Sequence, residues 1–126
     1  MTNHQVEKKL DFDKIASSFV AFCQTVQSLR DPKTGCPWDL KQTHQTLKKY
    51  LLEESYETIQ AIDSGDSSEI KDELGDVLLQ VVLHAQLACD QNDFTIDEVV
   101  QAVNDKMIRR HPHCLLYTSP SPRDRG

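Results

Sequence analysis

The apolar residues between positions 66 and 90 repeat with the period of an α-helix, and this repeat is the strongest constraint on the fold. They follow i, i+3, i+4, i+7 spacing, at Leu74, Val77, Leu78, Val81, Val82 and Ala85. Such spacing places them along one side of a helix, which predicts an amphipathic helix that packs against a neighbour. No stretch of useful length alternates with the two-residue period of a strand. The chain is therefore predicted to be all-α.

Three further segments complete a predicted antiparallel bundle of about four helices. Residues 12–29 carry apolar side chains at helical spacing. A second helix is expected to start between Asp39 and Thr43 and to run to about Ser64, with a buried stripe from Leu51 to Ile62. A fourth is expected from residue 95 to about residue 110. The short connections between these segments favour antiparallel neighbours.

The expected helix ends carry recognisable capping residues. Gly65 is placed to end the second helix in the left-handed conformation that glycine adopts without a side-chain clash. Asp66 with Glu69 resembles a capping box for the next helix, and Thr95 with Glu98 repeats the pattern. These residues predict helix boundaries near 65, 66 and 95.

Residues 31–38 interrupt the helical pattern between the first and second helices. Pro32, Gly35 and Pro37 all fall within this segment. Because proline removes a helical hydrogen bond and clashes with the preceding turn, a continuous helix is excluded here. An ordered loop is expected over residues 31–38.

The length of 126 residues suits one domain with a single modest core. Residues 1–10 are polar and expected to be a flexible N-terminus, and residues 11–113 are expected to form the domain. Residues 114–126 place Pro120 and Pro122 among serines and charges, so this tail is expected to be disordered and non-native.

The charge balance and the cysteines indicate the partners and the compartment. Fourteen basic against 20 acidic residues give a formal charge of −6. This charge disfavours a nucleic-acid polymer as partner, because lysine and arginine supply most non-specific affinity for phosphates. There is no C-x-x-C pair, signal peptide or apolar run of membrane-spanning length. The four cysteines are therefore expected to be reduced thiols in a cytoplasmic protein without a membrane partner.

Two closely spaced acidic pairs stand on the second and third predicted helices. Glu54 and Glu57 are three residues apart, as are Glu73 and Asp76, and Glu53 adjoins the first pair. On the assumed stripes, Glu54 would lie about 60–70° and Glu73 about 110° from the stripe centre, bordering the core. If the two helices pack antiparallel about a short turn at residues 64–68, the two pairs come opposite each other.

Carboxylates gathered in this way repel one another unless a cation binds among them. Two of them 4 Å apart repel by about 4 kcal/mol at an effective dielectric near 20. Oxygen-only ligands suit Mg²⁺, Mn²⁺ or Ca²⁺, and Mg²⁺ typically bridges carboxylates to substrate phosphates. The alternatives are an acidic face that is simply solvated, or a structural helical bundle with no response to metal.

The acidic set and its surroundings resemble a known enzyme family. Glu53-Glu54-x-x-Glu57, a gap, and Glu73-x-x-Asp76 match the signature of the all-α nucleoside triphosphate pyrophosphohydrolases. The segments "LRDPKTGCPWDLKQTHQTL", "YLLEESYE", "DELGDVLLQVVLHAQ" and "DKMIRRHPH" are similar to successive blocks of the MazG family, over about residues 26–113. The acidic signature alone is moderately specific, and together with the "GCPWD" and "RRHPH" segments it is strong.

The resemblance implies an Mg²⁺-dependent enzyme that cleaves a nucleoside triphosphate to monophosphate and pyrophosphate, with Mn²⁺ as a substitute ion. By position, the resemblance implies that four residues are metal ligands, namely Glu54, Glu57, Glu73 and Asp76. It implies that Glu53 is a third contact or the base. Lys106 and Arg110 would contact the phosphates. Trp38 and His44 could line a base pocket, although Trp38 is interpreted first as a loop anchor packed on the core.

The resemblance also implies a homodimer, since the family completes its helical bundles by dimerisation and an amphipathic chain of this size would gain from it. Many bacterial MazG proteins carry two such domains, and this sequence matches the N-terminal one. The alternative function is therefore a catalytically weak dimerising or regulatory nucleotide-binding module of a longer two-domain protein. Base preference is not readable from these residues.

Overall fold

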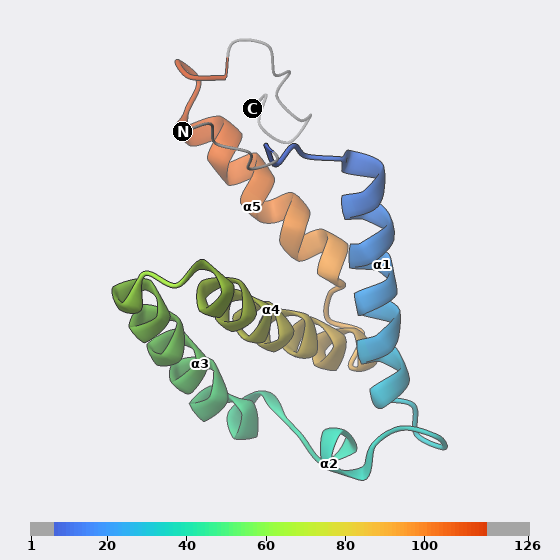
Figure 1. Ribbon diagram of the computed structural model, residues 1–126. Coiled ribbons are helices and arrows are strands. Elements are labelled where there is room, and N and C mark those ends of the chain that lie inside the picture. Colours follow the sequence, from blue (N-terminus) through green and yellow to red (C-terminus); the bar gives the residue numbers. More distant parts are fainter. Residues whose placement is uncertain (1–6, 116–126) are drawn as a thin grey trace. The chain divides into compact units, whose positions relative to one another are not determined.

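The computed structural model describes residues 7–115, and they form helices joined by turns, with no β-strand among them. The helices are α1 (Phe12–Leu29), α2 (Pro37–Leu40), α3 (His44–Ser64), α4 (Ser67–Asp90) and α5 (Ile96–Arg110) (Figure 1). They divide into two compact units, one ending at Lys41 and one beginning at Gln42. The all-α prediction is confirmed, and the long helices begin and end where their apolar repeats and caps place them. Residues 1–6 and 116–126, where most of the predicted flexible end and tail fall, lie outside the described part.

The first unit contains α1 and the loop that follows it. Asp11 caps the start of α1 by accepting a hydrogen bond from the Lys14 amide. After the helix, the Asp31 carboxylate accepts hydrogen bonds from the Lys33 and Thr34 amides at 2.8 and 2.9 Å. These bonds favour the charged form and hold the pKa of Asp31 below its ordinary value. The loop is therefore ordered by its own hydrogen bonds, as expected for residues 31–38.

The predicted extent of this loop was wrong at its end. Pro37 opens the one-turn helix α2, with Cys36 in the extended conformation before it. Proline fits the first helical position because its missing amide hydrogen would have no partner there. A guanidinium nitrogen of Arg30 donates to the Asp39 carbonyl and so ties α2 back to the end of α1.

The second unit is built on an antiparallel hairpin of α3 and α4, which pack along each other (Figure 1). Gly65 ends α3 with φ of 76°, the left-handed conformation predicted for it. Asp66 caps α4 by accepting from the Ser68 and Glu69 amides. The predicted capping box closes indirectly, because the Ser64 hydroxyl accepts from the Asp66 amide and donates to the Glu69 carboxylate.

Helix α5 completes the second unit and contacts α4. Thr95 stands at its N-cap as predicted, with its hydroxyl donating to the Glu98 carboxylate at 3.2 Å rather than capping a backbone amide. Asp105 is buried on this helix and accepts a hydrogen bond from Gln101 at 2.7 Å. This pairing gives the buried carboxylate a polar partner.

The predicted buried stripe on α3 was wrong in orientation, and the stripe on α4 was confirmed only at Val82 and Ala85. On α3 the buried residues are Leu47, Thr58 and Ala61, while Leu51 and Ile62 are 39% and 55% exposed. On α4 the buried residues begin at Gln80, and the predicted stripe members Leu74, Leu78 and Val81 are exposed. The side of each helix that faces its partner is therefore rotated away from the most apolar side. As a result, Glu54 and Glu73 lie within the seam between the helices instead of bordering it.

Two further predictions concern the cysteines and the membrane. All four cysteines, Cys23, Cys36, Cys89 and Cys114, are free thiols, as expected. None of the helices within residues 7–115 is long and apolar enough to cross a membrane.

Candidate metal site

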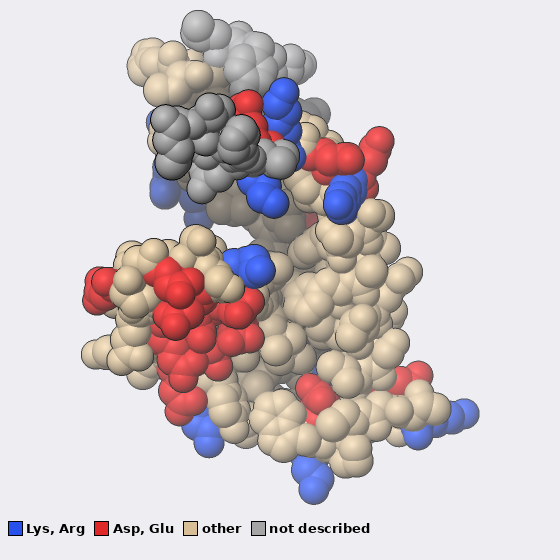
Figure 2. Space-filling model, viewed as in Figure 1, with Lys and Arg blue, Asp and Glu red and all other residues tan. Residues whose placement is uncertain are grey.

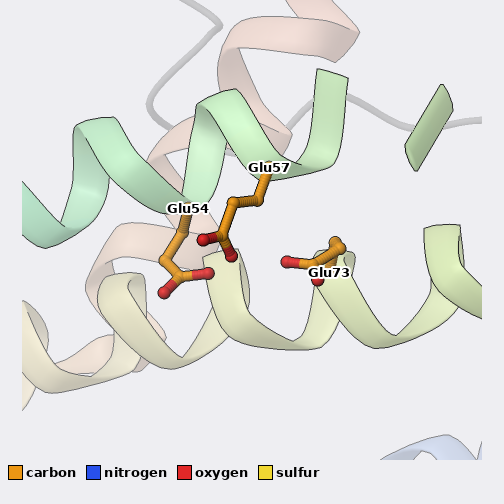
Figure 3. Close-up of side chains that lie close together, drawn as sticks. All are labelled: Glu54, Glu57 and Glu73. Atoms are coloured by element: carbon orange, nitrogen blue, oxygen red, sulfur yellow. The ribbon is translucent and has the colours of Figure 1, made fainter. Parts of the chain in front are cut away.

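Three carboxylates meet in the middle of the α3–α4 hairpin. Glu54 and Glu57 extend from α3 and Glu73 from α4, and each contributes an oxygen to a group whose members all lie within 4.8 Å of one another (Figure 3). Acidic side chains also form a continuous patch over this hairpin on the molecular surface (Figure 2). We call Glu54, Glu57 and Glu73 the carboxylate cluster. The predicted meeting of the two acidic pairs is therefore found for three of the four residues.

Thr58 ties the two helices together at the level of the cluster. Its hydroxyl lies 2.7 Å from the Glu54 carbonyl and 3.4 Å from the Glu73 carbonyl on the opposite helix. Because Thr58 is buried in the seam, this contact fixes how the two helices stand against each other. The seam thus holds Glu54 and Glu73 in place by their backbones.

One oxygen of Glu54 and one of Glu73 are buried without a hydrogen-bond partner. These are the Oε2 atoms of both residues. A buried carboxylate oxygen without a partner is unfavourable, since burial removes the water that would solvate it. Nearby positive charge would offset this cost. The two atoms are therefore the strongest structural indication of a cation at this place.

The electrostatics of the cluster agree with that interpretation. Burial, and then the charges of Glu57 and Asp76, raise the pKa of both Glu54 and Glu73 above the ordinary glutamate value. Each carboxylate makes its neighbours harder to ionise. The charged cluster is thus strained in the absence of a cation, and a divalent ion among its oxygens would relieve the repulsion.

The donor set fits a hard cation. All cluster ligands are carboxylate oxygens, which are the ligands that Mg²⁺, Mn²⁺ and Ca²⁺ prefer. Glu57 and Glu73 also line an open depression together with Gln60, Ala61 and Glu69. The depression leaves room beside the cluster for water or a substrate to complete a coordination shell.

Replacing Glu54 with glutamine is expected to stabilise the metal-free chain at neutral pH by a few degrees in melting temperature. A carboxyl with a raised folded-state pKa stabilises the fold when protonated, and that contribution is lost as pH rises through the folded value. Glutamine keeps the shape of the protonated form at every pH. As pH rises from about 4.5 to 7, the melting temperature of the variant should therefore fall less than the melting temperature of wild type.

Thermal melts in EDTA across this pH range, with Glu53→Gln as the exposed neighbouring control, test the prediction. An Mg²⁺-induced rise in melting temperature should appear in wild type and in the control but not in Glu54→Gln. A Glu54→Gln chain that is less stable than wild type in EDTA would show that the Glu54 charge is favourable as it stands.

Two predicted site residues of the acidic signature lie outside the cluster. Asp76 is exposed on α4 and is not among the three residues whose oxygens converge, although its charge acts on Glu54 and Glu73. Glu53 is also exposed, on the side of α3 next to Glu54. Their assignments as fourth metal ligand and as base stay predictions.

The remaining predicted contacts are distributed over both units. Lys106 and Arg110 are exposed on α5. Their charged side chains are therefore accessible to an anion. Trp38 is 49% exposed on α2 in the first unit, and His44 is the first residue of α3 in the second. A base pocket lined by Trp38 and His44 stays a prediction.

Sequence reasoning missed one polar contact in the same seam. The Nδ1 atoms of His44 and His84 lie 2.7 Å apart across α3 and α4. The signal was present in the spacing, because His44 precedes Glu54 by ten residues and His84 follows Glu73 by eleven. An antiparallel hairpin that brings Glu54 beside Glu73 also brings these histidines together, since both lie about three helical turns from the cluster.

Comparisons with known proteins agree with the geometry of the site. Residues 42–115 match the model of the family described as the MazG nucleotide pyrophosphohydrolase domain. This match covers the described part of the second unit, including the whole carboxylate cluster.

Individual relatives extend the match. The chain is 54% identical over 95 residues to the nucleoside triphosphate pyrophosphohydrolase/pyrophosphatase MazG of Thermotoga maritima, covering 75% of this chain and 37% of the relative. It is 48% identical over 94 residues to the nucleoside triphosphate pyrophosphohydrolase of Escherichia coli K12, covering 75% of this chain and 36% of the relative. It is 55% identical over 95 residues to the uncharacterized protein YabN of Bacillus subtilis, covering 75% of this chain and 19% of the relative.

The aligned region therefore spans between about a fifth and two fifths of these relatives' length. Family membership rests on the domain match, which includes all three residues of the carboxylate cluster. The chain belongs to the MazG nucleotide pyrophosphohydrolase family.

Proposed function

We propose that this chain hydrolyses nucleoside triphosphates to nucleoside monophosphates and pyrophosphate, by cleaving the bond between the α- and β-phosphates with Mg²⁺. The observation that carries the proposal is the carboxylate cluster, with oxygens within 4.8 Å and two of its buried oxygens unpartnered. The family match and the printed names of the relatives support the reaction class. Mn²⁺ is the expected substitute ion, because it accepts the same oxygen ligands.

The acidic residues divide into ligands and a group that orients water. Glu54, Glu57 and Glu73 would hold the cation, with Asp76 as a further ligand from the exposed side of α4. A bound divalent cation supplies charge neutralisation at the phosphate oxygens. Glu53 is the candidate base, since a base must lie within hydrogen-bond reach of the attacking water and Glu53 adjoins the cluster in sequence.

The positive and aromatic residues would bind the rest of the substrate. Lys106 and Arg110 lie one turn apart on α5 and are both exposed, which suits contacts to a triphosphate. Trp38 and His44 are the candidates for contacts to the base. Hydrolysis of unwanted nucleotides in the cytoplasmic pool is the expected cellular role.

A homodimer is part of the proposal. Exposed apolar side chains follow one side of each hairpin helix, at Leu52, Tyr56 and Ile59 on α3 and at Leu74, Leu78 and Val81 on α4. Each set has i, i+4, i+7 spacing, which is the pattern of a helix face that packs on another helix. A second copy of the chain would bury both sides in a larger bundle.

A second candidate function is a regulatory nucleotide-binding module with little turnover. It is favoured by the share of the relatives that the chain covers, 37% for the protein of Thermotoga maritima. The remainder of such relatives could hold a second catalytic unit. This candidate predicts that Mg²⁺ and nucleotide raise the melting temperature together without release of pyrophosphate.

The experiment that separates the two functions is product analysis with eight ribo- and deoxyribonucleoside triphosphates in Mg²⁺. Hydrolysis between the α- and β-phosphates gives equal amounts of monophosphate and pyrophosphate, which chromatography resolves from diphosphate and phosphate. The enzyme proposal expects monophosphate and pyrophosphate, with a ranking among bases that describes the base pocket. Diphosphate as the main product, or no product from any of the eight, would overturn it.

A further inference from the structure

His44 and His84 form an isolated imidazole pair where α3 begins, at the end of the hairpin opposite the Gly65 turn. His44 is the first residue of α3, and His84 lies in the second half of α4. Their Nδ1 atoms are 2.7 Å apart, and their ring planes are parallel within 5°. Both side chains are partly buried. The pair belongs to neither the carboxylate cluster nor the depression beside it.

The ring geometry shows a hydrogen bond that holds one proton. The ring centroids are 5.0 Å apart, and the two Nδ1 atoms are 2.7 Å apart. The difference is about the diameter of one imidazole ring, which is twice the distance from a ring centre to its own nitrogen. The two Nδ1 atoms therefore lie on the line between the ring centres. The two rings lie side by side in nearly the same plane, with their Nδ1 edges facing each other. Two N–H groups cannot point at each other at this distance, and two lone pairs would repel. One nitrogen must donate and the other accept.

The burial of the outer nitrogens indicates which ring donates. Nε2 of His84 is buried and has no hydrogen-bond partner. If His84 accepted at Nδ1, its own proton would sit on this buried Nε2 with nothing to receive it. Orphaned buried N–H groups are rarer in proteins than buried acceptors that lack a donor. Hence His84 donates its Nδ1 proton, and His44 accepts it while carrying its own proton on Nε2.

We propose that the single hydrogen bond between His44 and His84 holds α3 and α4 together at neutral pH, at the end of the hairpin away from the Gly65 turn, and is lost on acidification. We call this hydrogen bond the latch. The latch concerns the folding of the hairpin and lies outside the carboxylate cluster. It shares His44 with the proposed contacts to the base.

Acidification opens the latch because a further proton has no suitable place. On Nδ1 of His44 it would face the N–H of His84, or drive that proton onto the buried Nε2 of His84, where no acceptor receives it. Placed directly on Nε2 of His84, it would create a buried charge without a partner. Burial, and then the charge of His44, accordingly lower the pKa of His84 below its ordinary value of 6.5. A histidine with a lowered folded-state pKa stabilises the fold above pH 6.5, and that contribution is lost as pH falls through the folded value.

No carboxylate within residues 7–115 is among the causes of the pKa shift of His84. Among the described residues, His44 is the neighbour whose charge acts on His84. Asp90 on α4 and Asp105 on α5 accept hydrogen bonds from Gln86 and Gln101 and have further partners of their own. Other ionisable groups at this end of the unit include Lys48, Lys49 and Tyr50 on α3, Cys89 on α4 and Asp93 after α4.

The test compares wild type with His84→Asn by urea unfolding between pH 5.5 and 7.5. The amide oxygen of asparagine occupies the δ position and can accept the Nδ1 proton of His44. For wild type we expect the unfolding equilibrium constant to rise as pH falls below 6.5 through this pair, by at most about tenfold per pH unit for one proton. The variant should match wild type at pH 7.5 and lack this rise. His113→Asn, an exposed histidine after α5, is the matched control and should retain the wild-type pH dependence.

A second measurement needs no variant. Nitrogen-15 NMR of the wild-type imidazoles at pH 7.5 should show a protonated Nδ1 on His84 and an unprotonated Nδ1 on His44, with the His84 ring resisting protonation to below pH 6.5. Equal pH dependence in wild type and His84→Asn would overturn the latch. So would two rings that each carry their proton on Nε2, or that titrate independently at the ordinary value.

Discussion

The Glu57→Gln variant is expected to release pyrophosphate about 10³-fold more slowly than wild type while keeping its helices. Charge neutralisation by a metal is worth several kcal/mol in a transition state, and each 1.36 kcal/mol is about tenfold in rate. Glu57 is exposed and its carboxylate completes the carboxylate cluster, so glutamine removes a ligand charge without disturbing a packed seam. The loss should therefore appear in turnover and not in the far-UV circular dichroism spectrum.

Asp63→Asn is the matched control for that measurement. It removes one negative charge from an exposed position further along α3, outside the carboxylate cluster. Initial rates at saturating and at limiting Mg²⁺ should be close to wild type for Asp63→Asn and reduced at both concentrations for Glu57→Gln. Rates for Glu57→Gln within threefold of wild type would remove this residue from the site.

Gly35→Ala is expected to destabilise the first unit by about 3 kcal/mol or more, because the clash would be with backbone that cannot move aside cheaply. A Cβ on Gly35 would stand 2.4 Å from the Leu29 carbonyl oxygen, 2.5 Å from that of Asp31 and 2.8 Å from the Asp31 nitrogen. Gly35 also donates its amide proton to the Asp31 carbonyl at 2.8 Å, so the close approach is part of the loop itself. Relieving the clash would break this hydrogen bond.

Trp38, the one tryptophan of the chain, reports on this loop from α2. Its fluorescence in a urea titration should shift at clearly lower urea in Gly35→Ala than in wild type. Gly75→Ala provides the control, since a Cβ there meets nothing within 4 Å and an alanine inside α4 should add about 1 kcal/mol of helix stability. Similar transitions for the two alanine variants would contradict the argument from backbone crowding.

The secondary structure was predictable because it depends on local chemistry. The apolar repeat of α4, the left-handed Gly65 and the cap at Asp66 each act over a few residues, and all are readable in one sequence. The short helix α2 was missed although its signal was local. Pro37 was interpreted as a breaker, whereas proline at the first position starts a helix as readily as it ends one.

The candidate site was predictable in composition and less so in geometry. Like charges at helical spacing on two neighbouring helices indicated a cation site, and Glu54, Glu57 and Glu73 do converge. Their depth was misjudged, because the most apolar side of α3 was assumed to face α4. Leu52 is 64% exposed, whereas Thr58 lies in the seam. Which side faces the neighbouring helix depends on packing across the hairpin, which the pattern of a single helix does not contain.

The central claim is that the carboxylate cluster binds a divalent cation, and Mn²⁺ titration followed by electron paramagnetic resonance tests it most directly. Free Mn²⁺ gives a sharp spectrum that broadens on binding, so affinity is measured without nucleotide or turnover. The account predicts saturable binding to the wild-type chain, competition by Mg²⁺, and at least about tenfold weaker binding in Glu57→Gln. Equal Mn²⁺ affinity in wild type and Glu57→Gln, or no saturable binding to wild type, would contradict it.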